Sequence, residues 1–268
     1  MNSIKKMMLS GALGCLISGM AYADGSSPQP VKPYWQDIQV VAVNKEKPRS
    51  SFMSYADRET ALTSRFEKSP YYSLLNGTWK FFFVDSYKDL PQNITDPSVN
   101  TSSWDDITVP GNWEVQGHGV AIYTNHGYEF KPKNPQPPLL PEANPVGVYR
   151  RDIEIPANWD NRDIYLHIGG AKSGLYVYLN GKEVGYSEDS KNPAEFLINK
   201  YLQPGKNVLT LKIFRWSTGS YLECQDFWRM SGIERDVFLW SQPKASIQDF
   251  RVVSTLDDTY TNGIFKLA

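Results

Sequence analysis

Residues 175–186 have the sequence LYVYLNGKEVGY, in which two short strand-forming runs flank Asn180 and Gly181. Asn and Gly adopt positive φ angles at little cost, so this pair favours the type I′ turn of a two-residue β-hairpin. We therefore predict one strand over Leu175–Leu179 and a second over Lys182–Tyr186.

Further strands are predicted on both sides of this hairpin. Residues 79–84 form a continuous apolar run, which indicates a strand covered on both faces. Residues 149–155 and 209–213 alternate in polarity, which predicts one buried face, Arg151 excepted. Residues 163–168 and 237–240 supply two more strands. Turn residues between short strands and almost no helical periodicity predict an all-β antiparallel sandwich, with a jelly roll as the expected topology.

Three segments depart from this pattern. Residues 34–76 scatter their apolar residues without a period, so we predict an extended arm, with a weak helical alternative at 58–66. Residues 113–145 form an insertion rich in Pro, Gly and Asn, and loops of this length are usually functional or disordered. Residues 245–268 begin a new strand pattern, and a lone hairpin cannot bury its apolar face. We interpret this last segment as the start of another sandwich.

Composition and motifs exclude several classes of function. The 28 Lys and Arg residues nearly balance the 29 Asp and Glu residues, so no nucleic-acid or anionic-lipid partner is predicted. The sequence contains no phosphate-binding loop, dinucleotide fingerprint, zinc spacing or nucleophile elbow. The three histidines, His118, His126 and His167, lie far apart in sequence and match no metal motif.

The N-terminus predicts export. Two lysines precede the apolar run of residues 7–20, and small residues then lead to a predicted signal-peptide cleavage after Ala23. A helix needs about twenty residues to cross a bilayer, so no membrane span is predicted and we expect a periplasmic or secreted protein. A lipid anchor on Cys15 is an alternative, although its preceding residues form a poor lipobox. Cleavage would leave only Cys224, which excludes an internal disulfide.

Residues 215–237 combine bulky aromatic residues with alternating charges. The segment is too polar for a core and too bulky for a simple turn, and its composition is typical of an interface. Glu223 and Asp226 lie near Arg229 and Arg235, and acids among arginines are more often structural than catalytic. We therefore predict that this segment is a docking surface.

The sequence also resembles glycoside hydrolase family 2, and within it the N-terminal sugar-binding domain of the long bacterial β-galactosidases. The resemblance covers about residues 34–268, and several matching pieces are not shared with the β-glucuronidase and β-mannosidase branches. In chain order the pieces are Trp35-Gln36-Asp37, Val43-Asn44-Lys45, residues 75–80, 109–113, 122–125, 144–147, 180–182, 185–190, 193–196 and 215–237.

The resemblance implies roles for two residues. Asn125 would hydrogen-bond a sugar hydroxyl, and Asp189 would contact the region of the galactose 6-hydroxyl and help to hold a sodium ion with ligands from a catalytic barrel. From the residues alone, both are more often turn residues. Because the family carries its catalytic glutamates on that downstream barrel, no catalytic residue is assigned here. No cofactor is expected in this chain, whereas sodium and magnesium are expected for the complete enzyme.

Departures from the family pattern lie close to Asn125. His126, Gly127 and Glu129 replace the more usual residues after this asparagine, and Cys224 stands where an acid is common. None of these changes removes Asn125 or Asp189 itself. Because of them, the resemblance does not identify the exact substrate.

The N-terminal pattern and the resemblance together predict four segments. We expect a signal peptide at residues 1–23, a tether and extended arm at 24–74, a galactose-binding-domain-like jelly roll at 75–243, and the incomplete start of an immunoglobulin-like sandwich at 244–268. The expected function is that of the N-terminal part of a β-galactosidase, inactive alone, which contributes substrate contacts and docks on its barrel. A freestanding carbohydrate-binding module and a fragment that complements a separately encoded barrel remain alternatives.

Overall fold

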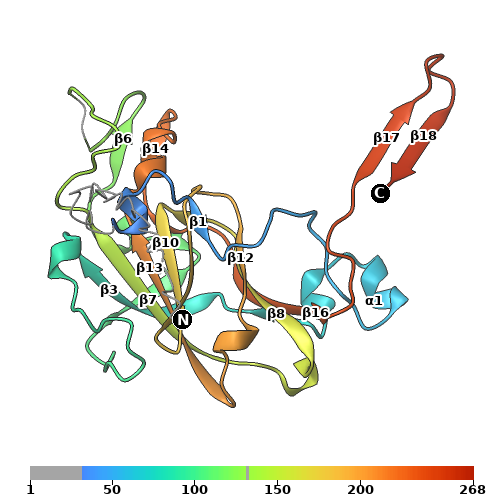
Figure 1. Cartoon of the computed structure of the whole chain (residues 1–268), viewed down its shortest axis with the longest axis horizontal. Helices are drawn as coiled ribbons and strands as arrows, with labels where there is room; N and C mark the ends of the chain where they lie inside the picture. Colours follow the sequence, from blue (N-terminus) through green and yellow to red (C-terminus); the bar gives the residue numbers. More distant parts are fainter. Residues whose placement is uncertain (1–31, 131–132) are drawn as a thin grey trace, which may run out of the picture. The chain divides into compact units, whose positions relative to one another are not determined.

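The computed structural model describes residues 32–130 and 133–268 (Figure 1). The predicted signal peptide, and the tether as far as residue 31, lie outside the described residues. Within the described part, every strand pairing is antiparallel, and one short α-helix, α1 (Arg58–Leu62), is present. That helix lies inside the segment for which the sequence offered a helical alternative.

Two sheets form the body of the fold. The larger has the strand order β1-β11-β10-β13-β7-β3-β4, and the smaller β12-β8-β16-β2 (Figure 1). Their bounds are β1 (Ala42–Val43), β2 (Tyr72–Leu74), β3 (Gly77–Val84), β4 (Asp105–Val109), β7 (Val146–Glu154), β8 (Arg162–Ile168), β10 (Gly174–Leu179), β11 (Lys182–Ser187), β12 (Ala194–Leu197), β13 (Lys206–Phe214) and β16 (Val237–Pro243).

Three small sheets and several 3₁₀ turns complete the described chain. Three small sheets are β14 (Phe227–Arg229) with β6 (Ile122–Thr124), β5 (Gly111–Asn112) with β15 (Gly232–Ile233) and β9 (Ala171–Lys172), and β17 (Val252–Leu256) with β18 (Gly263–Leu267). The 3₁₀ turns are η1 (Tyr34–Gln36), η2 (Phe66–Lys68), η3 (Tyr87–Asp89), η4 (Glu114–Gln116), η5 (Ala157–Trp159), η6 (Asn199–Tyr201) and η7 (Thr218–Tyr221).

The main core lies between the two sheets. The larger sheet contributes Trp79, Phe81 and Leu211, and the smaller contributes Leu166 and Leu239; each is at most 1% exposed. Burial of such side chains is the dominant favourable term in folding. The predicted all-β antiparallel sandwich is therefore confirmed.

A second apolar layer covers the outer face of the larger sheet. Trp35, from the N-terminal arm, is 1% exposed and stacks on Phe214 with ring centroids 4.9 Å apart. Val146, Val148 and Tyr186 belong to the same cluster and are fully buried. This cover explains why β3 has apolar residues on both faces, as its continuous apolar run predicted.

The predicted hairpin at residues 175–186 is confirmed. Asn180 and Gly181 have φ angles of 53° and 76°, and they connect β10 to β11. The prediction for β7 needs one correction: Arg150 was assigned to the polar face but is only 5% exposed. Its guanidinium donates to Thr210 Oγ1 and to the carbonyls of Ile94 and Val99. These acceptors take the place of the water molecules that would bind an exposed arginine.

One buried carboxylate is among the contacts that hold the arm against the smaller sheet. Glu195 accepts two hydrogen bonds from Arg49 at 3.1 Å, one from Trp240 Nε1 at 3.1 Å, and contacts His167 Nδ1 at 2.8 Å. Burial raises the pKa of Glu195, but the His167 hydrogen bond and the Arg49 charge outweigh it, so the pKa lies below its ordinary value. The arm therefore depends on an ionised carboxylate.

We expect Glu195→Gln to lower the free energy of unfolding by about 2 kcal/mol near neutral pH, since charge-assisted hydrogen bonds are lost. Because the folded-state pKa of Glu195 is lowered, its stabilising effect is present above the ordinary glutamate pKa and disappears as the pH falls through the lowered value. Urea unfolding followed across the acid range would measure the difference between wild type and variant. A difference that does not shrink toward low pH would contradict the assignment.

Candidate functional site

Asn125 directly follows strand β6 and is exposed. β6 pairs with β14 of the 215–237 segment, with Thr124 opposite Phe227. The Asn125 side chain contacts its neighbour His126, with Oδ1 2.8 Å from Nδ1. The position of Asn125 is therefore set by the backbone of β6, which in turn depends on what holds β6.

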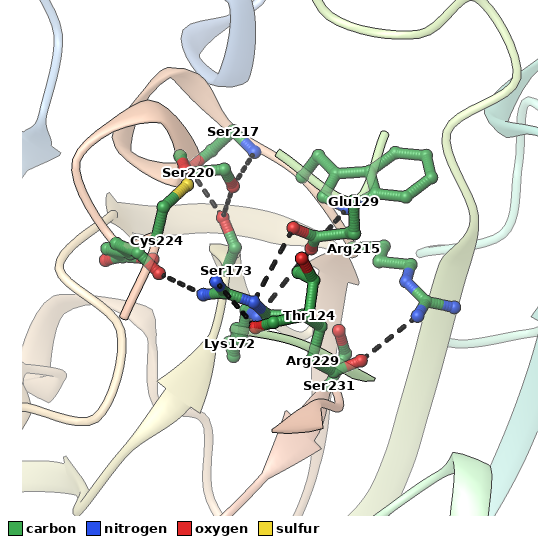
Figure 2. A network of polar contacts seen from close by, with 12 residues as sticks. Thr124, Glu129, Lys172, Ser173, Arg215, Ser217, Ser220, Cys224, Arg229 and Ser231 are labelled. Atoms are coloured by element: carbon green, nitrogen blue, oxygen red, sulfur yellow. Dashed lines mark hydrogen bonds and ion pairs between the residues drawn. The ribbon is translucent and has the colours of Figure 1, made fainter. Parts of the chain in front are cut away.

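Two buried arginines hold the backbone around β6 (Figure 2). Arg215 donates to the carbonyl of Val120 at 2.8 Å and to that of Arg229 at 3.1 Å. Arg229, only 1% exposed, donates to the carbonyl of Glu223 at 2.8 Å and reaches that of Thr124 at 3.5 Å. The residue before Asn125 is thus tied to the opposite segment.

Glu129 supplies the countercharge from the insertion. Its side chain is 4% exposed and lies 4.0 Å from both Lys172 Nζ and Arg229 Nε (Figure 2). It also accepts a hydrogen bond from Trp216 Nε1 at 3.0 Å. Ion pairs removed from water are strongly coupled, so loss of one partner leaves an uncompensated charge. We call Glu129, Lys172, Arg215 and Arg229 the buried charge network.

Burial shifts the pKa values of two charged residues in this region, Lys172 and Glu114. Burial lowers the pKa of Lys172, although Glu129 and Glu223 act in the opposite direction. Burial raises the pKa of Glu114, against the Ser231 backbone hydrogen bond and the charge of Arg215. Glu114 lies 3.7 Å from Arg215, so the network continues to the start of the insertion.

Asp189 follows β11 and is exposed, with a φ angle of 72°. Its Oδ1 accepts a hydrogen bond from Asn192 Nδ2 at 2.8 Å, an arrangement typical of the turn role that Asp often has. Asp189 also forms part of the wall between two pockets. One, of about 370 Å³, contains His167 and Glu195, and the other, of about 440 Å³, contains Lys172 and Phe227.

Both predicted sugar contacts lie around the 215–237 segment. Phe227 pairs with Thr124 in the strand ladder, next to Asn125, and also lines the same pocket as Asp189. Asn125 itself does not line that pocket. The structure thus links the two residues through Phe227 without placing them in one cavity.

The acids of the segment are structural, but not through the arginines that the sequence suggested. Glu223 Oε1 accepts from the backbone of Ser190 at 2.8 Å, and Asp226 accepts from Tyr123 Oη at 2.7 Å. Arg229 has Glu129 as its ion-pair partner instead. The insertion that carries Glu129 is distant in sequence, so the neighbours of Arg229 along the chain were a poor guide.

Residues 215–237, the segment predicted to form a docking surface, are partly covered by the chain's own insertion. Trp216, Tyr221 and Arg229 are at most 9% exposed, and Trp216 contacts Glu129 and Phe130 of the insertion. Docking on a barrel stays a prediction, which concerns the exposed side chains of the segment. Trp228 and Tyr123 remain 53% and 55% exposed, as a ring pair with centroids 5.6 Å apart.

The sequence reasoning missed Lys172. This lysine is 3% exposed and stands in β9, which pairs with β15. The available signal was its position in the otherwise small and apolar run GGAKSG immediately before a predicted strand. No group of three His, Cys, Asp or Glu side chains within residues 32–130 and 133–268 is arranged to hold a metal ion. No helix in that same part is long and apolar enough to cross a membrane.

Comparison with known proteins gives a consistent set of relatives. The profile described as "Glycosyl hydrolases family 2, sugar binding domain" matches residues 72–243. The chain is 41% identical over 234 residues to a β-galactosidase of Priestia megaterium, covering 86% of this chain and 23% of that protein. It is 38% identical over 229 residues to a β-galactosidase of Psychromonas ingrahamii, covering 85% and 22%. The chain spans less than a quarter of the length of these curated relatives.

Solved structures agree on the fold. A β-glucuronidase from an uncultured Clostridium species superimposes with a TM-score of 0.53 at 23% identity, covering 73% of this chain and 33% of that one. A β-glucuronidase of Bifidobacterium dentium, solved with coumarin-3-O-glucuronide, superimposes with a TM-score of 0.53 at 19% identity. The match covers 70% of this chain and 33% of that one. At these identities the likeness concerns the fold alone.

We expect Arg229→Met to lower the free energy of unfolding by about 3 kcal/mol, because Glu129 would be left buried without one of its cationic partners. Amide hydrogen exchange at residues 120–130 should accelerate as β6 loses its anchor. Lys206→Met is the matched control, since its ion pair with Asp152 is exposed, and it should change stability by less than about 1 kcal/mol. Equal urea midpoints for the two variants would contradict a stabilising role of the buried charge network.

Proposed function

Because the chain belongs to glycosyl hydrolase family 2, we propose that it is the N-terminal part of a β-galactosidase, which hydrolyses terminal non-reducing β-D-galactose residues. The observation that carries this proposal is that relatives named β-galactosidase match 86% of this chain with only 23% of their own length. The chain would contribute substrate contacts and docking for a catalytic barrel, and would be inactive alone.

Asn125 and Asp189 are the proposed sugar contacts. Both are exposed polar side chains, and the backbone before Asn125 is anchored by the buried charge network. Rigid support of this kind is what a binding group needs to keep its geometry. Asn125 would hydrogen-bond a sugar hydroxyl, and Asp189 would contact the galactose 6-hydroxyl region.

Asp189 is also the proposed sodium ligand. A carboxylate oxygen suits a hard cation. Within the described residues Asp189 belongs to no group of three His, Cys, Asp or Glu side chains, and the proposal places the other ligands of the ion on a barrel. Magnesium, proposed for the complete enzyme, is assigned to no residue here.

The proposed organisation keeps the boundaries derived from the sequence: a signal peptide at 1–23, a tether and arm at 24–74, a jelly roll at 75–243 and the start of an immunoglobulin-like sandwich at 244–268. The exposed apolar side chains of β17 and β18 support the last boundary, because Val252, Leu256, Phe265 and Leu267 are 47% to 67% exposed. Export to the periplasm or medium belongs to the same proposal and rests on residues 1–23.

The isolated chain should show no turnover of an aryl β-galactoside, because retaining hydrolysis needs two carboxyl groups about 5 Å apart across the scissile bond. Glu223 and Asp226, the acids of the central segment, are engaged with Ser190 and Tyr123 instead. Release of nitrophenol from a nitrophenyl β-galactoside is the measurement. Activity that disappears when one carboxylate of this chain is changed would refute the proposal.

A chimera tests the positive part of the proposal. Residues 34–243 would replace the matching segment of the Priestia megaterium β-galactosidase, and the hybrid should cleave the aryl galactoside. Within it, Asn125→Ala and Asp189→Asn should each lower kcat/KM roughly tenfold or more, the loss expected for one hydrogen bond. Asn199→Ala, which removes a residue bonded to Arg162 and Ile164, is the control for a change away from the sugar contacts.

Two alternatives predict different results. A freestanding carbohydrate-binding module would bind galactose tightly without any barrel, and the Asn125 and Asp189 variants would leave the chimera unaffected. A complementing fragment would restore activity to a separately produced barrel when the two are mixed.

A further inference from the structure

Glu188, the residue before Asp189, is a buried acid that the proposed function does not use. It directly follows β11 and is 3% exposed, whereas Asp189 is exposed. A carboxylate taken out of water is costly unless it is hydrogen-bonded, so its partners show what it does in the fold.

The carboxylate of Glu188 is bonded to the turn η7. Its Oε2 accepts from the backbone N–H of Gly219 at 2.7 Å. The hydroxyl of Thr218 lies 3.1 and 3.0 Å from the two carboxylate oxygens, and Tyr186 Oη donates to Oε1 at 2.7 Å. Both oxygens are therefore satisfied, and the end of β11 is linked to a turn 30 residues further along the chain.

The rest of Glu188 is held as closely as its carboxylate. Its N–H donates to the carbonyl of Val41 in the N-terminal arm at 2.9 Å, and its carbonyl accepts from Ser187 Oγ at 2.7 Å. A Cβ added to Gly219 would lie 3.0 Å from Oε2 of Glu188, so the turn and the carboxylate are in close contact. The position of Glu188 is thus fixed at its backbone and at its side chain.

Asp189 stands between two such ties and has an uncommon backbone conformation. The N–H of Ser190 donates to Glu223 Oε1 at 2.8 Å, so a second carboxylate bonds the residue after Asp189 to the 215–237 segment. The φ angle of Asp189 is 72°, in the left-handed region that residues other than glycine seldom adopt. Such a conformation persists only where the surroundings impose it, and Glu188 and Glu223 provide that constraint.

Stability alone does not account for an acid at this position. Burial raises the pKa of Glu188 against the effect of its hydrogen bonds, and the nearby charge of Glu223 acts in the same direction as burial. A raised pKa means that ionising Glu188 costs the folded state more than the unfolded chain. The contacts of this carboxylate therefore define a position rather than add stability at neutral pH.

We propose that Glu188 is a positioning residue, which holds the Asp189 carboxylate in place through its contact with η7. This role rests on the proposed function of Asp189 and adds a residue that acts through it. Glutamine suits the same place, because its carbonyl oxygen can accept from Gly219 and its amide can donate to the hydroxyls of Tyr186 and Thr218. Alanine leaves η7 without this partner.

Amide hydrogen exchange in the isolated chain tests the positioning without relying on the proposed function. Exchange at residues 188–192 should accelerate roughly tenfold or more in Glu188→Ala, because the turn loses its hydrogen bonds to η7, and should stay near the wild-type rate in Glu188→Gln. Glu183→Ala is the matched control, since this exposed acid lies on the same strand but bonds Tyr178. It should leave exchange at 188–192 unchanged.

A double-mutant cycle in the chimera tests whether Glu188 acts through Asp189. Glu188→Ala should lower kcat/KM for the aryl galactoside roughly tenfold, and Glu188→Gln should keep it near the wild-type value. In a chimera that already carries Asp189→Asn, the same Glu188→Ala change should have little further effect, because residues of one network are not additive. Glu183→Ala should leave the activity unchanged.

Thr218→Val approaches the contact from the other side and should accelerate the same amides, which decides the question if Glu188→Ala does not fold. Unchanged exchange at residues 188–192 in the folded variants would overturn the positioning role. A further loss of the same size from Glu188→Ala in the Asp189→Asn chimera would overturn it as well. Accelerated exchange combined with a chimera that Asp189→Asn leaves fully active would support the positioning and contradict the proposed sugar contact of Asp189.

Discussion

A guanidinium group shut away from water is the constraint on which the candidate site depends. Arg229 is 1% exposed, so its donors must find oxygen atoms inside the protein. Its two terminal nitrogens reach the carbonyls of Glu223 and Thr124, while Nε has no hydrogen-bond partner among the described residues and lies 4.0 Å from the countercharge of Glu129. The contacts of this one cation therefore tie together two segments that are distant in sequence, the insertion and residues 215–237.

The same requirement explains why a long insertion can be well positioned without much regular structure. Its described residues between η4 and β7 contain one three-residue strand, β6, yet the backbone contacts Arg215 at Val120 and Arg229 at Thr124. Charged donors to carbonyls are stronger than neutral hydrogen bonds. In this insertion, polar contacts fix the position of the backbone, whereas elsewhere in the fold apolar packing does so.

The sheets provide the rigid base for this arrangement. The larger sheet is covered on one face by the smaller sheet and on the other by the arm that carries Trp35. Its central strands are consequently buried on both sides, which limits their motion. Lys172 and the 215–237 segment directly adjoin the ends of β10 and β13 along the chain.

The sequence by itself determined the longer strands, the Asn180-Gly181 turn, the antiparallel sandwich and the family, because these follow from local alternation, turn chemistry and short pieces of chain that match the family. Asn125 and Asp189 came from the resemblance, and their roles remain proposals. Only the tertiary structure decided that Lys172 is buried and that Arg229 pairs with Glu129 rather than with adjacent acids. The physical reason is distance along the chain: Trp216 and Glu129 are 87 residues apart, and no local pattern specifies which charges folding will enclose together.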